Sequence, residues 1–592
     1  MKSLIELLSE EAKKAFDKAG YEGQDIRVNI SARPDLCEYQ CNAAMPLAGK
    51  YKKAPLVIAE EVAGILSESP AFSRVEAVKP GFINLDASGR WICDHINEMA
   101  GDDSFGVDKQ SDSTVIVDYG GPNVAKPLHV GHLRSAVIGE SVKRICRFMG
   151  CNTIGDIHMG DWGLQMGLII HEVSLRKPEL PYFDESFKGE YPKEAPFTIG
   201  ELEEIYPSAS KKSKEDEAYR EEAMKATLEL QEGRRGYRAL WDHIMNVSVT
   251  DMKKIYDALD VHFELWNGES TVQDRIPGMV QYLKDGGWAY MSEGALVVDV
   301  ARESDKKKLP PCMILKSDGA SLYNTTDLAT LMDREENYKP DRIIYLTDKR
   351  QNMYFEQIFR CAVKTGITPD TTELVHIGFG TVNGKDGGPY KTREGGVPRL
   401  ESLIKEIDDE MLRKISESNR EKGRDISPEE ERETSKTVAL AAIKYGDLSN
   451  QASKDYIFDT DKFTSFEGDT GPYILYTAVR IRSIMRKYEE ETGDKCPCIF
   501  KGEPTPAEKS LMKEIAGFHE AVRSAFNECA PHRICGYAHD LSDAMNSFYH
   551  GNRILGIDDK DHQKDMIALI GLTGRLLETC AELLGFSIPE RM

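Results

Sequence analysis

Several features that would assign the chain to other protein classes are absent from its 592 residues. No apolar run approaches the roughly 20 residues needed to cross a bilayer. The acidic, amphipathic start lacks the apolar block of a signal peptide. The 12 cysteines are scattered, and Cys496-Pro-Cys498 and Cys37…Cys41 lack a second half at zinc spacing. We therefore expect a cytoplasmic protein with reduced, mostly buried thiols, no membrane partner and no protein metal site.

Positive charge is also scarce, because the formal net charge is −23. A general nucleic-acid binder is expected to have a basic footprint, so composition alone favours a metabolic enzyme. A specific RNA-binding protein stays possible, since local basic patches on an acidic body can bind RNA. The 40% hydrophobic and 30% charged residues are typical of a globular chain. At this length about three domains are expected.

The most informative stretch is a strand, a loop rich in glycine and proline, and a helix. Residues 114–117 form a short β-branched run, and residues 133–149 have apolar side chains at helical spacing. His129 and His132 stand at the start of that helix, where free N–H groups attract phosphate. Gly131 leaves room for a flat ligand beside the backbone. Phosphate binding is therefore favoured over the two alternatives, a metal site and a purely structural histidine pair.

The residues of this loop resemble a known family. His129-Val-Gly-His132 is similar to the first signature of class I aminoacyl-tRNA synthetases, and residues 117–135 resemble arginyl-tRNA synthetases in particular. The resemblance spans nearly the whole chain. It implies an arginine–tRNA ligase that activates L-arginine with ATP to arginyl-adenylate and transfers it to the 3′ end of tRNA(Arg), releasing AMP and pyrophosphate. It also implies Mg²⁺ bound with ATP without a dedicated protein cage, and adenylate formation that depends on bound tRNA. We expect a monomer.

The predicted elements suggest three domains. Residues 1-110 combine helix and strand patterns in an N-terminal α/β module, which the resemblance assigns to tRNA contact. Residues 111-400 alternate strands and helices, which predicts a doubly wound parallel, Rossmann-like sheet with an insertion at about 174-290. Residues 401-592 show helical patterning throughout, typical of an all-α helix bundle, here the anticodon-binding domain of the family.

Two details of the central domain follow from local patterns. Residues 312–315 and 342–346 are apolar runs that we expect to be strands of the nucleotide-binding sheet. Residues 174–235 are acidic and rich in Pro, Lys and Glu, which predicts a solvated, loop-like insertion.

The predicted sheet should bind its ligands at the carboxyl ends of its strands. A guanidinium is a planar fork of donors that needs carboxylate and hydroxyl acceptors. Tyr323 and Asp327 lie four residues apart at a predicted helix start, hence on one face, although a core tyrosine and a first-turn helix acid are the alternatives. The resemblance assigns both residues to the guanidinium. It assigns Asp118, Asn123 and Gln351 to the amino-acid end of the substrate or to the wall around it.

The glycine-rich stretch at residues 384–395 departs from the second class I signature. It lacks the Lys-Met-Ser-Lys-Ser sequence, and the expected second lysine falls near Thr392. Arginyl enzymes often differ in this way, and a lysine just before the histidines compensates there. The resemblance therefore divides the triphosphate charge among Lys126, Lys391 and Arg393, while a solvated glycine-rich connector is the alternative. The other ATP-binding residues that it implies are Asn123, Ala125, His129, Gly131 and His132.

Two groups of residues are candidates for tRNA contact. Phe82 and Asn84 suit it chemically, because an aromatic ring stacks on an unpaired base and an amide reads a base edge; a core Phe and a turn Asn are the alternative. Tyr473, Tyr476 and Arg480 recur at helical spacing, and such a stripe suits unstacked bases, although stripes of this kind are more often core. The resemblance implies that the second group contacts the anticodon. It also includes the chain end, Met592, in the tRNA-binding set.

Three other functions stay open. Another class I synthetase would share the use of ATP and tRNA, and a charging assay with all amino acids separates the two. A catalytically inactive relative that binds tRNA as an interaction module would show no ATP-dependent charging. A nucleotidyltransferase that does not act on tRNA would also use a His-x-Gly-His turn, but would leave the helical third domain without a role.

Overall fold

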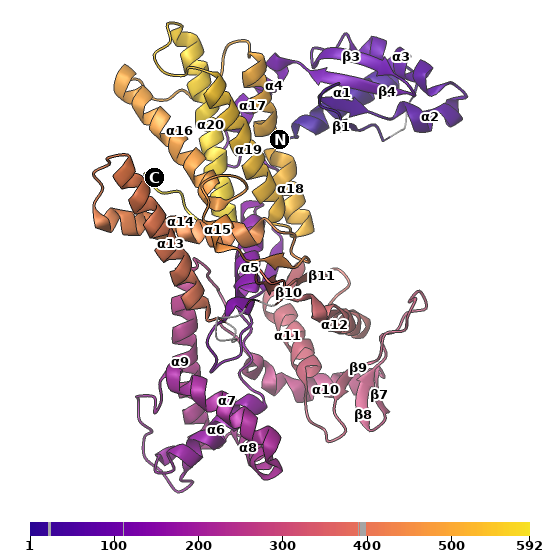
Figure 1. Cartoon of the computed structure of the whole chain (residues 1–592). Helices are drawn as coiled ribbons and strands as arrows, with labels where there is room; N and C mark the ends of the chain where they lie inside the picture. Colours follow the sequence, from indigo (N-terminus) through magenta and orange to yellow (C-terminus); the bar gives the residue numbers. More distant parts are fainter. Residues whose placement is uncertain (22–24, 111, 389, 391–397) are drawn as a thin grey trace. The chain divides into compact units, whose positions relative to one another are not determined.

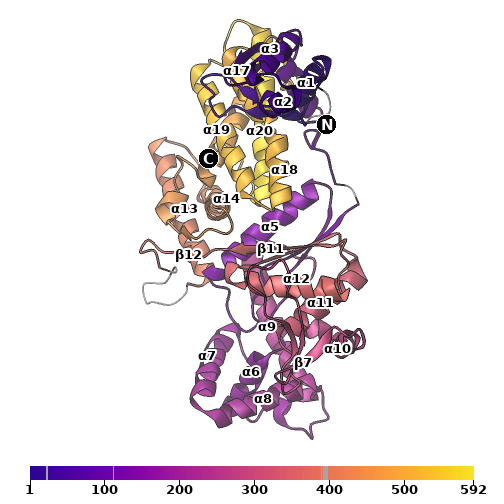
Figure 2. The same ribbon diagram turned by 90° about the vertical axis from the view of Figure 1, so that its right-hand side faces the viewer.

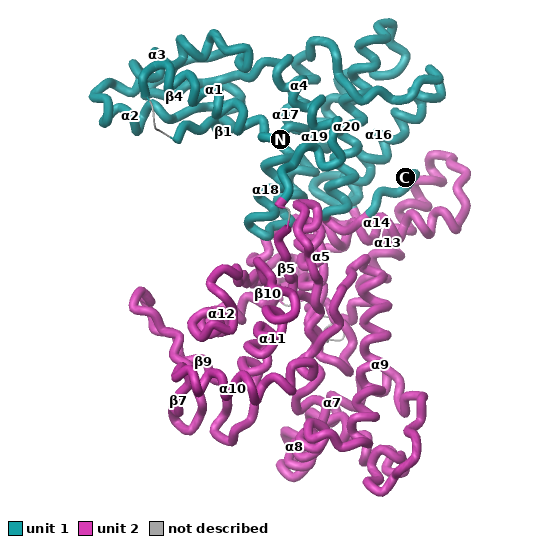
Figure 3. The backbone as a smooth tube through the Cα atoms, turned by 180° about the vertical axis from the view of Figure 1, so that it is seen from behind, with its two compact units in different colours: residues 1–109, 465–583, 587–592 teal, residues 110–464, 584–586 magenta. Residues whose placement is uncertain are grey.

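The structure is a computed structural model that describes residues 1–21, 25–110, 112–388, 390 and 398–592. The chain forms two compact units (Figure 3). Unit 1 contains residues 1–109, 465–583 and 587–592, and unit 2 contains residues 110–464 and 584–586. Within the described ranges, no helix has both the length and the apolar character of a bilayer span. The three-domain division stays a prediction.

A four-stranded parallel sheet forms the centre of unit 2. Its strands are β5 (Thr114–Asp118), β6 (Asn152–Asp156), β10 (Arg342–Asp348) and β11 (Glu373–Phe379). They lie in the order β11-β10-β5-β6, and every neighbouring pair is parallel. The predicted doubly wound parallel sheet is therefore confirmed.

The connections of this sheet create a ligand-binding crevice. Helix α5 (Leu133–Phe148) joins β5 to β6, and α12 (Asn352–Thr365) joins β10 to β11. Helix α5 lies on one side of the sheet, and α12 lies on the other with α11 (Tyr323–Tyr338) (Figures 1 and 2). Since the strand order proceeds in opposite directions from β5 and β10, the carboxyl ends of these two adjacent strands form the switch point at which such folds bind ligands.

Strand β9 (Cys312–Leu315) corrects one prediction. The strand exists, but it pairs antiparallel with β8 (Ala295–Val298), which pairs with β7 (Ala289–Ser292), so it does not belong to the parallel sheet. An apolar run fits any buried strand position, and the tertiary fold decides its partner. Side chains of β8, β9 and α10 (Ile276–Asp285) share one apolar core with α11, α12 and β10. This core fixes α11 beneath the sheet.

The acidic stretch before residue 235 corrects a second prediction. It is not loop-like, since it contains two helices, α7 (Ile199–Glu215) and α8 (Glu217–Gln231). Thr198 and Glu201 form a capping box at the first, and the Asp216 side chain accepts two N–H groups at the start of the second. The charges that suggested a loop lie on the outer helix faces, while apolar residues of both helices are buried against α6.

The remaining elements of unit 2 surround the sheet and the glycine-rich stretch. They are α6 (Leu164–Arg176), α9 (Arg235–Ala258), α13 (Leu400–Glu421), α14 (Pro428–Leu448), α15 (Thr460–Phe463), β12 (Val382–Asn383) and β13 (Tyr456–Ile457). The last two strands pair in parallel, so the chain that enters the glycine-rich stretch is paired with the chain that follows α14.

Unit 1 combines a small sheet with long helices. Four antiparallel strands lie in the order β1-β2-β4-β3: β1 (Val28–Ile30), β2 (Tyr39–Cys41), β3 (Phe72–Val78) and β4 (Phe82–Ala87). The first four helices are α1 (Leu4–Lys18), α2 (Ala44–Tyr51), α3 (Pro55–Leu66) and α4 (Gly89–Ala100). The later ones are α16 (Gly471–Thr492), α17 (Pro506–Ala516), α18 (Phe518–Glu528), α19 (His532–Gly551) and α20 (Lys560–Leu584). Gly517 separates α17 from α18.

Candidate active site

The histidine turn, residues 129–132, leads from the loop after β5 into helix α5. It is one 3-10 turn in which the two imidazole centroids lie 4.0 Å apart. His129 Nδ1 accepts the N–H of Gly131 at 3.0 Å, and His132 Nδ1 accepts the N–H of His129 at 3.1 Å. Because both Nδ1 atoms are acceptors, a neutral ring carries its proton on Nε2. Each ring therefore has its donor on the nitrogen away from the backbone.

The charge state of this pair follows from its surroundings. Burial, together with His129, lowers the pKa of His132 to about 3. Burial and nearby Lys126 also lower the pKa of His129. Both rings are therefore neutral donors near pH 7. A Cβ on Gly131 would lie 2.7 Å from His129 Cε1, so a side chain there would displace the first imidazole.

The loop before the turn is held by neighbouring elements. Ala125 has a positive φ of 60°, and its N–H donates to Ser248 Oγ on α9 at 2.9 Å. Asn123 is exposed and forms a β-bridge with Gly160, which follows β6. Ala125 thus contributes backbone shape, while Asn123 presents its side chain beside the carboxyl ends of β5 and β6.

The predicted cations of the triphosphate site are described only in part. Lys126 Nζ lies 4.3 Å from the ring centroid of Tyr206 on α7, so the insertion helices hold this ammonium in a cation–π contact. Lys391 and Arg393 lie outside the described residues. Their shares of the triphosphate charge stay predictions.

Two buried carboxylates stand in register at the ends of β5 and β6. Asp118 and Asp156 are partners across the two strands, and Arg334 Nη2 of α11 donates to both, at 2.6 and 2.7 Å. The guanidinium is only 1% exposed. One buried cation therefore compensates two carboxylates, so this part of the site keeps an excess of negative charge.

Further acids extend this excess toward the start of α11. Asp327 accepts a hydrogen bond from Tyr354 OH on α12, and burial and Asp118 raise its pKa. Burial raises the pKa of Glu269, at the start of η3 (Glu269–Arg275), to about 7, and Asp327 adds to that shift. No ion pair links Asp327 or Glu269 to a cation in the described part of the chain. We call Asp118, Asp156, Asp161, Glu269 and Asp327 the acidic cluster.

His158 stands among these acids. Its imidazole interacts electrostatically with four of them, Asp118, Asp161, Glu269 and Asp327. Its two ring nitrogens are buried and have no hydrogen-bond partner among the described residues. Asp161 differs from the other acids, since the N–H and hydroxyl of Ser270 both donate to it. The acidic cluster and the adjoining His158 together offer carboxylates and an imidazole to a ligand rich in donors.

Tyr323 and Gln351 are both exposed at the start of a helix. Tyr323 is the first residue of α11 and is 69% exposed, so the alternative of a core tyrosine is wrong. Burial of its hydroxyl side and the charges of Glu269 and Asp327 raise its pKa, which places the phenol near these acids. Gln351 is exposed at the start of α12, after β10. Tyr323, Asp327 and Arg334 share one face of α11, because they follow at i, i+4 and i+11.

Sequence reasoning missed five members of this site. Asp156, His158 and Asp161 lie close together at the end of the second strand of the sheet and just after it, and none of them, nor Arg334 or Glu269, was among the predicted site residues. A charged residue in the middle of a predicted apolar helix face, as at Arg334, was the available signal. Nothing local marked Glu269, since only the fold brings η3 against α11.

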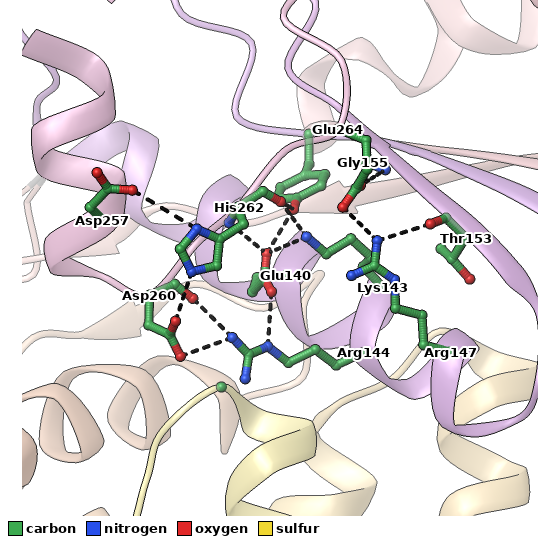
Figure 4. Close-up of polar contacts among 12 residues, drawn as sticks. Glu140, Lys143, Arg144, Arg147, Thr153, Gly155, Asp257, Asp260, His262 and Glu264 are labelled. Atoms are coloured by element: carbon green, nitrogen blue, oxygen red, sulfur yellow. Dashed lines mark hydrogen bonds and ion pairs between the residues drawn. The ribbon is translucent and has the colours of Figure 1, made fainter. Parts of the chain in front are cut away.

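A second group of buried charges lies along α5 and is fully paired (Figure 4). Glu140 forms ion pairs with Lys143 at 2.9 Å and with Arg144 at 2.8 Å, and it also accepts a hydrogen bond from Tyr119 OH. Arg144 continues to Asp260 at 2.9 Å. Burial would raise the pKa of Glu140, but the two cations outweigh it and the pKa is lowered. We call Glu140, Lys143, Arg144 and Asp260 the paired network, and it anchors α5 to the chain after α9.

The stripe on α16 in unit 1 is partly exposed and is not core. Tyr473 donates from its OH to Asp543 of α19 at 2.6 Å. The Arg480 guanidinium carbon lies 4.7 Å from the ring centroid of Tyr476 and 5.0 Å from that of Tyr549. The aromatic rings and the guanidinium therefore form one accessible ladder across α16 and α19, of which Tyr549 was not predicted.

The other candidates for tRNA contact lie elsewhere in unit 1. Phe82 is half-buried, whereas Asn84 is 6% exposed in the middle of β4, and Gln40 donates to its side-chain oxygen at 2.9 Å. The turn position considered for Asn84 is wrong, since it is a strand residue. Met592 ends a segment whose Ile588 and Pro589 carbonyls accept from Arg482 of α16.

Metal binding has no candidate cluster in the structure. Over the described ranges, no three His, Cys, Asp or Glu side chains are arranged to hold an ion. Four of the five carboxylates of the acidic cluster accept hydrogen bonds from Arg334, Tyr354 or Ser270.

Three segments of the chain match known protein families. Residues 95–460 match the family described as "tRNA synthetases class I (R), catalytic domain". Residues 474–592 match the "DALR anticodon binding domain", and residues 2–87 match the "Arginyl tRNA synthetase N terminal domain".

Individual relatives agree over the full length. The arginine–tRNA ligases of Agathobacter rectalis and Alkaliphilus oremlandii are 60% and 52% identical over 599 and 594 residues, with both chains covered completely. The solved arginyl-tRNA synthetase of Plasmodium falciparum has a TM-score of 0.82 at 26% identity, with complete coverage of both chains. That of Thermus thermophilus has a TM-score of 0.78 at 21% identity, also with complete coverage, which is a likeness of fold.

Proposed function

The chain belongs to the arginyl group of the class I tRNA synthetases, and from this premise we propose that it is an arginine–tRNA ligase. Its substrates are then L-arginine, ATP and tRNA(Arg). Its products are arginyl-tRNA, AMP and pyrophosphate. Both chemical steps take place at the carboxyl ends of β5 and β10.

The observation that supports arginine as the amino acid is the uncompensated acidic cluster. Asp327 and Glu269 are partly buried carboxylates whose pKa values are raised by burial, and neither forms an ion pair with a cation in the described part of the chain. A planar guanidinium brings one positive charge and five donors, which satisfies two carboxylates and the Tyr323 hydroxyl together. An ammonium, as in lysine, is a point charge and leaves part of this acceptor set without a partner.

The activation step needs position and charge stabilisation, and no protein nucleophile. With its guanidinium held at Asp327, the amino-acid end of arginine extends toward Asp118 and Asn123 at the end of β5. Its carboxylate attacks the α-phosphate of ATP, and pyrophosphate leaves. Negative charge builds on the phosphoryl oxygens, and the Nε2–H donors of His129 and His132 stabilise it. Lys126, Lys391 and Arg393 supply positive charge to the triphosphate.

The transfer step joins the arginyl group to tRNA. The terminal adenosine attacks the adenylate carbonyl through its 2′-OH, as the class implies, and AMP leaves. The ladder of Tyr473, Tyr476 and Arg480 offers stacking faces and a cation to unstacked anticodon bases. Phe82, Asn84 and Met592 complete the proposed tRNA-binding set.

Three finer points belong to the same proposal. Mg²⁺ enters with ATP as a substrate, the protein acts in the cytoplasm, and it acts as a monomer. Chelation of Mg²⁺ should abolish charging, and the mass in solution should equal that of one 66.4 kDa chain. Pyrophosphate exchange measured with and without tRNA shows whether activation depends on tRNA.

Charging of purified tRNA with each of the 20 amino acids tests the proposed function. Arginine should be attached in an ATP-dependent reaction, and lysine should be a poor substrate. Preference for another amino acid would make the chain a different class I synthetase. Absence of any ATP-dependent charging would favour a protein that only binds tRNA.

The histidine turn has its own test. His132→Ala should lower the rate of adenylate formation by roughly 10²–10³, because removal of one donor to a developing oxyanion costs that much. Its affinity for tRNA should stay near the wild-type value, since His132 belongs to unit 2 and the ladder to unit 1. Unchanged turnover would contradict the role of the imidazoles.

A further inference from the structure

Arg134 is a buried charge close to the histidine turn that the proposed chemistry does not use. It lies in the first turn of α5, two residues after His132, and is 1% exposed. Its Nε faces Asp447 Oδ2 of α14 at 3.2 Å, and Asp447 is 0% exposed. Tyr456 donates its OH to the same carboxylate at 2.8 Å, and the Arg134 guanidinium carbon lies 5.0 Å from the Tyr456 ring centroid.

The guanidinium also binds the backbone on the way to the glycine-rich stretch. Arg134 Nη1 donates to the Gly380 carbonyl at 3.0 Å and to the Lys454 carbonyl at 2.8 Å. Gly380 begins the connection from β11 to β12, and Lys454 precedes β13. One side chain of α5 therefore holds both chains that form the β12–β13 pair.

The far end of the same stretch is attached to the histidine turn as well. The Val130 N–H donates to the Pro398 carbonyl at 3.1 Å, and the Leu400 N–H donates to the Leu128 carbonyl at 2.9 Å. The described chain on each side of the glycine-rich stretch thus hydrogen-bonds to the turn or to the helix that follows it. Backbone bonds provide one attachment, and the Arg134 side chain provides the other.

We propose that Arg134 is a positioning residue for ATP. It fixes the segment at Gly380 against α5, so that the distance between the histidine donors and the start of the glycine-rich stretch stays constant. This inference rests on the proposed function. Arg134 does not touch a substrate. It acts through the Gly380 and Lys454 carbonyls, while Asp447 and Tyr456 keep its guanidinium in place.

Arginine is needed at this position because of geometry. Its fork acts in two directions at once, because Nε forms an ion pair with a carboxylate and Nη1 donates to two carbonyls. A lysine keeps the charge next to Asp447 but has a single nitrogen, which cannot reach the carboxylate and both carbonyls together. Arg134→Lys therefore loosens the attachment while the buried carboxylate keeps a cation.

Steady-state pyrophosphate exchange with tRNA present tests the proposal. Arg134→Lys should raise the KM for ATP about tenfold, while the KM for arginine changes less than about twofold and kcat at saturating ATP stays within about threefold. Arg144→Lys is the matched control. Arg144 also lies on α5 and binds carboxylates, but its partners are Glu140 and Asp260. It should change either KM by less than about twofold.

A milder variant keeps the proposal testable even if Arg134→Lys does not fold. Tyr456→Phe keeps the ring under Arg134 and removes only the hydroxyl that holds Asp447, so it should raise the KM for ATP about threefold. If Arg134→Lys does not fold, this variant decides, and an unchanged KM for ATP overturns the proposal.

Other outcomes would also overturn it. These are equal rises in both KM values for Arg134→Lys, no change in either, or the same ATP effect in Arg144→Lys. Failure of the proposed function looks different, because the wild-type protein would then show no arginine-dependent exchange at all.

Discussion

The acidic cluster and the paired network are two groups of buried and partly buried charges in the same unit, and they differ in one respect. In the paired network, Glu140 is 2% exposed and meets two cations, so its pKa is lowered although burial acts to raise it. In the acidic cluster, burial raises the pKa of Asp327 and Glu269, and Arg334 is already bound by Asp118 and Asp156.

This difference separates structural charge from functional charge. A carboxylate whose pKa is lowered by its partners stabilises the fold, whereas one whose pKa is raised by burial costs stability until a ligand compensates it. The paired network fixes α5, and the acidic cluster keeps an excess of negative charge that an added cation would compensate. Variants of the two groups should therefore affect different measurements.

The largest effect should come from Asp327→Asn. It removes one partly buried charge that holds the substrate guanidinium, so kcat/KM for arginine should fall about 10³-fold, equivalent to about 4 kcal/mol. The melting temperature should stay constant or rise, because an uncompensated buried charge becomes a neutral amide. Charging kinetics and thermal unfolding measure the two effects. A large loss of stability with normal kinetics would place Asp327 in the structural group.

Glu140→Gln should show the reverse behaviour. It leaves Lys143 buried without a carboxylate, which should lower the free energy of unfolding by roughly 3 kcal/mol. At temperatures where the variant is folded, kcat/KM for arginine should stay within about threefold of wild type. Denaturant titration and charging at low temperature measure these effects. Strong loss of activity without loss of stability would remove the distinction between the two groups.

The pH dependence of arginine binding is the next effect. Glu269 has a pKa raised to about 7, so it is protonated at pH 6 and ionised at pH 8. Since only the ionised form compensates a guanidinium, the KM for arginine should rise about tenfold from pH 8 to pH 6. The profile of Glu269→Gln should be flat over this range. A wild-type profile without this slope would contradict the assignment of Glu269.

Stability should respond to pH with opposite sign in the two groups. The folded protein binds the Glu269 proton more tightly than the unfolded chain, so this acid costs stability as pH rises from about 4.5 to about 7. Glu140 has a lowered pKa, so its contribution is present above the ordinary carboxyl pKa and is lost as pH falls through the lowered value.

Tyr323→Phe should give the smallest effect. It removes one hydroxyl acceptor at the exposed edge of the acidic cluster, which should raise the KM for arginine by about three- to tenfold, equivalent to roughly 1 kcal/mol. Stability should not change, because the ring is 69% exposed. The effect should be compared with that of Asp327→Asn. An equally large loss in Tyr323→Phe would mean that the hydroxyl, and not the charge, binds the guanidinium.

The sequence predicted those parts of the fold and site that depend on local order. The strand at β5, the histidine turn and helix α5 are continuous in the chain, and periodicity together with the family motif identified them. Tyr323 and Asp327 were also within reach, since one helix face brings them together. For the same reason the exposed stripe on α16 was identified, although its partner Tyr549 on α19 was not.

The rest depends on contacts between distant segments. Arg334 donates to Asp118, which lies 216 positions earlier in the sequence, and no local pattern predicts such a pair. Residues 312–315 were predicted as a strand but assigned to the wrong sheet, because an apolar run does not specify its partner. The helices α7 and α8 were not predicted, because charged residues on their exposed faces dominate the composition of this stretch. The few apolar residues on their buried faces contribute little to it.

Calorimetric titration with L-arginine and with L-citrulline at pH 8 is the most direct test of the acidic cluster. Citrulline has nearly the same shape, but a neutral ureido group replaces the guanidinium. If buried, uncompensated carboxylates hold the substrate, citrulline should bind at least about 100-fold more weakly than arginine, equivalent to roughly 3 kcal/mol. Equal affinity for the two ligands would contradict the account.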